Sequence, residues 1–157
     1  MYMTITEGNQ EYKFKASAVT NILYKRMFGS DPTQIFQVRA KKLNDPKMKA
    51  DLQKVIEISS LPEDDPKRLE VASEVAENTQ IFELAQSLSD FSKQYGYITF
   101  VEANNDPKDV NKKLNVEDYT VWLMQFDDGF FKVHSSKFKD LYDKNGRASS
   151  VPKNQVV

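Results

Sequence analysis

The chain has 157 residues, of which 39% are apolar and 29% charged, and this size and composition are typical of one folded domain. It contains no cysteine, which excludes disulfides, thiolate catalysis and cysteine-based zinc sites. The net charge of −1 gives no overall attraction to nucleic acid or to an anionic membrane, and no apolar run approaches the length of a membrane span. We therefore expect a soluble, cytoplasmic protein.

The charges are unevenly distributed along the chain. Residues 61–110 carry eleven Asp and Glu against four Lys and Arg, whereas residues 1–60 carry six against ten. The middle of the chain is therefore an acidic block. A solvated helix face is the favoured interpretation of this block, and a role in orienting an assembly is the alternative.

The chain begins with a predicted β-hairpin over Met3 to Phe14. Strand-forming residues flank Glu7-Gly8-Asn9, where Gly and Asn can adopt the positive φ that a tight turn requires. An isolated hairpin is only marginally stable in water. We therefore expect this one to pack on helices.

Helices are predicted to follow the hairpin directly. Ser17 can cap the first of them, which ends at Phe28 because Gly29 suits the C′ position. The next helices each begin with aspartate at the N-cap and proline at the first helical position, a strong start signal. These pairs are Asp31-Pro32, Asp45-Pro46 and Asp65-Pro66.

The stretch from Ile81 to Val101 is the predicted spine of the domain. Its apolar residues recur at helical spacing and form one stripe that must be buried against other elements. The members of this stripe are Ile81, Leu84, Ala85, Leu88, Phe91, Tyr95 and Ile98. Residues 95–102 also favour a strand by composition, and the sequence leaves helix or strand open there. We choose helix, with a possible kink at Gly96.

The C-terminal third is dense in aromatic residues. Asn115 caps a predicted helix through Phe126, and Ser135 or Ser136 can cap a last helix. Residues 144–157 are polar and predict a flexible C-terminal tail. The predicted fold is therefore mainly α: a compact multi-helix domain over residues 1–143 with a small N-terminal β-hairpin.

Phe130 and Phe131 are the candidate partner-binding residues. They are adjacent and follow the polar turn Asp127-Asp128-Gly129, so they are hard to bury together on one face. Aromatic side chains dominate interface hot spots, and one of the two could be an exposed anchor for a partner. The alternative is that both belong to the core.

No residue cluster indicates catalysis, a cofactor or a metal. His134 is the single histidine and has no neighbouring nucleophile, and the acidic turns lack the alternating spacing of a calcium loop. We expect no enzyme activity, no cofactor and no metal. Nucleic-acid binding would depend on one ordinary basic patch near acidic residues, and we do not expect it. That patch consists of Arg39, Lys41, Lys42, Lys47 and Lys49.

Several segments occur in an order that is found in a known family. After the hairpin come Leu23-Tyr24-Lys25-Arg26-Met27-Phe28-Gly29-Ser30-Asp31, the long central helix, Ala103-Asn104-Asn105-Asp106-Pro107 and Val116-Glu117-Asp118-Tyr119-Thr120-Val121-Trp122-Leu123. In this order and character the chain resembles the tail assembly chaperones of long-tailed phages and prophages of Gram-positive bacteria. The likeness covers most of residues 1–131, and a longer charged insert between Asp45 and Glu77 departs from it.

The resemblance implies a function without catalysis. Such chaperones bind and shield the tape measure protein, and help recruit tail tube subunits, in part through a frameshifted extended form. An amphipathic client helix would lie in a groove between chaperone helices, and homo-oligomers are compatible with this function. The resemblance places the protein in the host cytoplasm and not in the mature virion. The alternative is another small phage structural or adaptor protein, such as a head–tail completion protein that is retained in the virion.

Overall fold

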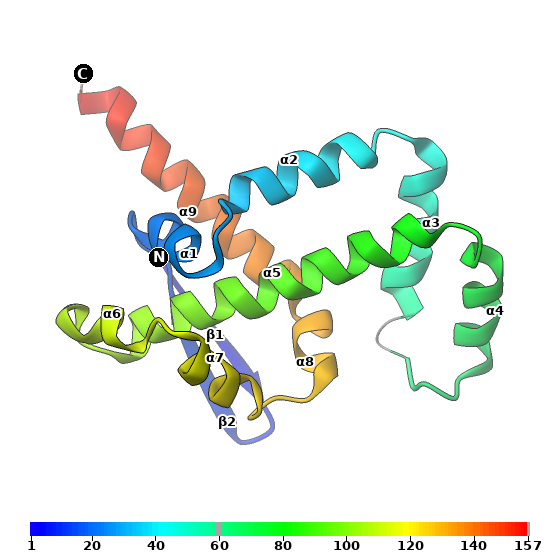
Figure 1. Ribbon diagram of the computed structural model, residues 1–157, viewed down its shortest axis with the longest axis horizontal. Helices are drawn as coiled ribbons and strands as arrows, with labels where there is room; N and C mark the ends of the chain where they lie inside the picture. The colour runs from blue at the N-terminus through cyan, green and yellow to red at the C-terminus, as the bar shows by residue number, and fades with distance from the viewer. Residues whose placement is uncertain (59–60, 157) are drawn as a thin grey trace.

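The computed structural model describes residues 1–58 and 61–156, with the side chains of residue 128 and of residues 146–156 outside the description. The described chain is mainly helical and begins with a two-stranded antiparallel hairpin, which confirms the predicted fold class. Figure 1 shows the long helix α5 running through the molecule, with the hairpin towards one end and α3 and α4 at the other.

The hairpin consists of β1 (Tyr2–Glu7) and β2 (Gln10–Lys15), and it packs on α5. Gly8 has φ 62°, the left-handed value that the tight turn was expected to need. Ile5 and Phe14 are fully buried, so one face of the hairpin belongs to the core. The predicted packing of the hairpin on helices is confirmed.

The predicted helices are found in the predicted order, and the structure adds the short helices η1, α6 and α8, which the sequence analysis does not predict. Their bounds are α1 (Thr20–Phe28), α2 (Pro32–Lys42), α3 (Pro46–Ile58), α4 (Pro66–Val75), α5 (Thr79–Asn104), the 3₁₀ helix η1 (Pro107–Asp109), α6 (Val110–Lys113), α7 (Val116–Leu123), α8 (Asp128–Val133) and α9 (Ser135–Val156). The Asp-Pro starts are confirmed, because Asp31 and Asp65 accept hydrogen bonds from the amides of Thr33 and Lys67 at 2.8 and 2.9 Å.

The stretch that composition left open is helical. Helix α5 continues through residues 95–102 and ends at Asn104, as one element (Figure 1). Tyr95, Tyr97, Ile98 and Thr99 are all buried, so other elements cover this part of α5 on more than one side. These residues favour strands by composition but form a helix here, because tertiary packing outweighs intrinsic propensity.

Gly96 allows the close packing of two aromatic rings against α5. A Cβ added there would lie 3.1 Å from Phe138 Cε1 and 3.4 Å from Trp122 Cη2. Phe138 is fully buried and Trp122 nearly so, and each ring also contacts Phe131. The glycine is therefore a packing requirement of the core.

We expect Gly96→Ala to lower the free energy of unfolding by about 1 kcal/mol, because overpacking of about 1–3 kcal/mol outweighs the helix preference for alanine. Gly129→Ala in α8 is the matched control, since a Cβ there has no neighbour within 4 Å. The control should raise the free energy of unfolding by up to about 1 kcal/mol. Urea unfolding of both variants checks the opposite signs, and a stabilised Gly96→Ala protein would contradict the packing argument.

The last helix is longer than the sequence predicts. Helix α9 continues to Val156, past residue 144 where the predicted tail begins. Asn145 is buried, and its Nδ2 donates a hydrogen bond to the Ser17 carbonyl at 3.0 Å. This contact fixes the helix to the segment before α1. The mobility of residues 144–157 stays a prediction.

Candidate functional site

A hollow on the surface lies between α3, α4, α5 and the junction of α8 with α9. We call this hollow the apolar groove, and its volume is about 300 Å³. Its lining is Val55, Ile56, Ile58, Arg68, Ala72, Phe82, Ala85, Gln86, Leu88, Ser89, Lys132 and Ser135. Hydrophobic side chains predominate in this lining, as in most protein sites that bind apolar ligands or helices.

Small side chains on α4 and α5 leave room for the apolar groove, since Ala72, Ala85 and Ser89 are part of its lining. Helix α4 buries Val71 and Val75 and presents the small side chain of Ala72 to the groove. At the start of α5, Phe82 lies off the apolar stripe and is 45% exposed. A half-exposed aromatic ring beside an open apolar hollow is a typical anchor for a protein partner.

Helix α3 packs on the first half of α5 through a small hydrophobic cluster of its own. Met48 and Leu52 from α3 contact Ile81 and Leu84 from α5. Arg39 of α2 adds a polar contact, since its buried guanidinium donates to the Leu84 carbonyl. The contacts of Met48 and Leu52 with α5 position the α3 wall of the groove.

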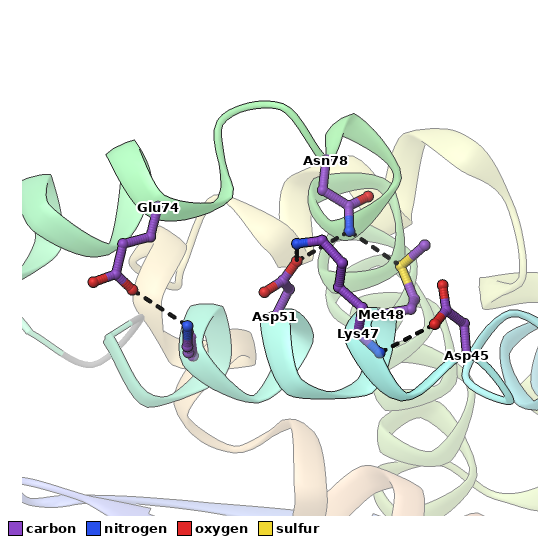
Figure 2. Close-up of polar contacts among 7 residues, drawn as sticks. Asp45, Lys47, Met48, Asp51, Glu74 and Asn78 are labelled. Carbon is purple, nitrogen blue, oxygen red and sulfur yellow. Dashed lines mark hydrogen bonds and ion pairs between the residues drawn. The ribbon is translucent and has the colours of Figure 1, made fainter.

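Polar contacts complete the attachment of α3 to its neighbours (Figure 2). The buried Asp51 carboxylate accepts hydrogen bonds from Asn78 Nδ2 and Lys47 Nζ, both at 3.2 Å. Because Asn78 immediately precedes α5, this contact links α3 to the beginning of the spine helix. Lys54 and Glu74 form a half-exposed ion pair at 3.3 Å between α3 and α4.

The hydrogen bonds from Asn78 and Lys47 lower the pKa of Asp51. A folded-state pKa below the unfolded value contributes stability above the unfolded pKa, and this contribution is lost as the pH falls through the folded pKa. We therefore expect Asp51→Asn to reduce the free energy of unfolding near pH 7, with a smaller difference from the native chain near about pH 3.

Glu74→Gln is the control for this pair of measurements. It also replaces a carboxylate by an amide, but it removes only a half-exposed ion pair and should change the free energy of unfolding by less than about 1 kcal/mol. Urea titrations at the two pH values measure both variants. An Asp51→Asn difference that stays constant with pH would contradict the assigned role of the carboxylate.

The charged side chains along the apolar groove are both cationic. Arg68 comes from α4 and Lys132 from α8, and no Asp or Glu is found among the described lining residues. One Arg68 nitrogen donates to the Leu61 carbonyl at 2.8 Å. Helices α4 and α5 lie in the acidic block of the sequence, but no carboxylate of this block belongs to the described lining of the groove.

A second polar cluster lies at the other end of α5. The hydroxyls of Ser17 and Thr20 each donate to the Glu102 carboxylate at 2.6 Å. Burial raises the pKa of Glu102, and these two hydrogen bonds oppose that shift. Both hydroxyl protons are committed to the carboxylate, so the cluster joins the start of α1 to α5. No sequence signal indicates this cluster, because Glu102 is more than 80 residues from both Ser17 and Thr20.

The predicted exposure of Phe130 or Phe131 is wrong. Phe130 is 5% exposed and Phe131 is 1% exposed, and the two rings belong to the same core cluster and contact each other, with their centroids 5.0 Å apart. Phe130 contacts Tyr12 of the hairpin, whereas Phe131 contacts Trp122 of α7. Other elements cover α8 on two sides, and adjacent residues can therefore both be buried. Neither ring is an exposed anchor.

The proposed basic patch is divided in the structure. Arg39 is buried against α5, and Lys47 is paired with Asp51. These two cations are therefore engaged within the protein.

His134 lies in a partly buried position at the α8–α9 junction. Its Nε2 is 3.6 Å from a Glu7 carboxylate oxygen of the hairpin. Burial lowers the pKa of His134, and Lys137 adds to this effect.

In the part of the chain that the structure describes, no group of three or more His, Asp or Glu side chains could hold a metal ion. Over the same residues, no helix has both the length and the apolar character needed to cross a membrane.

The apolar groove is thus the best candidate site, and one sequence signal could have located it: Phe82 is an aromatic residue outside the apolar stripe. Comparison with known proteins adds no further indication, because no family model, curated protein or solved structure matches the chain.

Proposed function

We propose that the protein is a tail assembly chaperone that binds and shields the tape measure protein and helps recruit tail tube subunits during tail morphogenesis. The resemblance of its segments to that family suggests the client. The observation that carries the proposal is the apolar groove with the half-exposed Phe82 beside it. An apolar helix face laid in a groove between helices is a recurring mode of protein recognition.

In this mechanism the groove covers part of the apolar stripe of a client helix. Each groove is small, about 300 Å³, and one contact is therefore weak. Many copies bound along one long client gain avidity from repetition, and tube subunits can displace them one at a time. The chaperone works by covering apolar surface, and the mechanism requires no catalytic group.

Co-expression with the proposed client, a long, helix-rich tape measure protein that we expect to be encoded beside this gene, tests the proposal. The client should be soluble when the chaperone is present and insoluble without it, because its apolar surface is then uncovered. Mass spectrometry of purified virions should not detect the chaperone. Its presence there, together with an insoluble client, would support a head–tail completion or other structural role and overturn the proposal.

A further inference from the structure

One residue of the groove lining carries a buried polar atom that has no partner. Ser89 of α5 is 3% exposed and lines the groove, and its Oγ has no hydrogen-bond partner among the described residues. Other hydroxyls of α5 donate to carbonyls of the preceding turn, as Ser92 does to Leu88 and Thr99 to Tyr95. A buried polar atom without a partner is unfavourable, and a bound molecule can supply the missing hydrogen bond.

The charges at the groove have one sign. Arg68 and Lys132 lie in different walls, on α4 and α8, and Lys132 is exposed. Arg68 uses one nitrogen for the Leu61 carbonyl, and a guanidinium has further donors. An occupant that carries acidic side chains beside its apolar surface would complement these cations, and complementary charge determines which partners are selected.

We infer that the groove takes an amphipathic client helix with one polar side chain in its apolar stripe, facing Ser89, and with acidic side chains beside the stripe, facing Arg68 and Lys132. This inference depends on the proposed function and specifies the chemistry of the client segment. The helix form follows from the shape of the site, an apolar hollow between helices and open to the surface.

Labelled helical peptides test the charge preference by fluorescence anisotropy. One peptide has a leucine stripe with a central glutamine and glutamates beside it, and a second has lysines in place of the glutamates. The glutamate peptide should bind about tenfold more tightly, and added salt should reduce this ratio. Lys132→Glu should reduce the ratio to about threefold or less. Lys137→Glu is the matched control, because Lys137 is exposed on α9 and is not part of the groove lining.

A third peptide, with leucine in place of the central glutamine, tests the hydroxyl. Ser89→Ala should weaken binding of the glutamine peptide about threefold to tenfold and leave the leucine peptide nearly unchanged. Circular dichroism confirms that each variant is folded. No binding, equal binding of the acidic and basic peptides, or an equal effect of Ser89→Ala on both peptides would overturn the inference.

Client solubility separates this inference from the proposed function. If the native chain keeps the client soluble but binds the acidic and basic peptides equally, the client chemistry is wrong and the chaperone function stands. If the client stays insoluble, the chaperone function fails even where a peptide binds. A long-chain fatty acid could displace the acidic peptide, and Ser89→Ala could leave peptide binding unchanged. These two results together would assign the groove to a small amphipathic ligand and overturn the inference that its occupant is a client helix.

Discussion

Phe138→Ala should lower the free energy of unfolding by about 3–5 kcal/mol, the range for a fully buried phenylalanine. Phe138 belongs to α9 and contacts Phe14 of the hairpin and Phe131 of α8, and its ring also lies against Gly96 of α5. Its removal leaves a cavity where these elements meet. Because a domain of this size has about 5–15 kcal/mol of stability, the variant should be close to unfolding.

Phe82→Ala is the matched control for this substitution. It removes the same atoms from a ring that is half exposed, and should lower the free energy of unfolding by less than about 1.5 kcal/mol. Urea unfolding followed by the fluorescence of Trp122, the single tryptophan and part of the same core, measures both variants. Equal losses for the two variants would contradict the placement of Phe138 at the centre of the core.

The helix starts could be predicted because their chemistry is local. Aspartate caps and proline at the first helical position act within three residues, and Asp31 and Asp65 form the expected hydrogen bonds. The start of α1 is a different case. Ser17 was expected to cap it, but the helix begins at Thr20 and the Ser17 hydroxyl donates to Glu102. The Ser17 hydroxyl oxygen also accepts a hydrogen bond from the Val19 amide at 3.3 Å, so the long-range contact adds to a local one that the sequence alone suggests.

The error at Phe130 and Phe131 has a similar origin. The prediction assumed that two adjacent aromatic residues after a polar turn are hard to bury together on one face. Helix α8 instead contacts the hairpin, α5 and aromatic residues of α7 and α9. The number of covered faces depends on which elements meet in space, and spacing along the chain does not contain that information.

The apolar groove could not be assembled from the sequence for the same reason. Its walls come from α3, α4, α5 and the α8–α9 junction, which are separated by as many as 80 residues. Each wall residue reads as an ordinary member of an amphipathic helix when it is taken alone. Phe82 is the exception, because it breaks the stripe of α5, and it now marks the edge of the groove.

Filling the groove should abolish client protection without unfolding the protein. Ala72→Trp places an indole in a hollow of about 300 Å³ from an exposed position on α4, so no core side chain has to move. The client in co-expression should become as insoluble as it is without the chaperone. The affinity for the acidic helical peptide should fall at least about tenfold, as for the loss of a binding hot spot.

Ser73→Trp is the control because it adds an indole to the next residue of α4, which is exposed and outside the groove lining. It should keep the client soluble, whereas both tryptophan variants should unfold at the urea concentration of the native chain or slightly above it. Client protection that survives Ala72→Trp would show that the client binds elsewhere. Loss of protection in both variants would mean that added apolar surface, and not the groove, determines the outcome, since exposed indoles promote non-specific association.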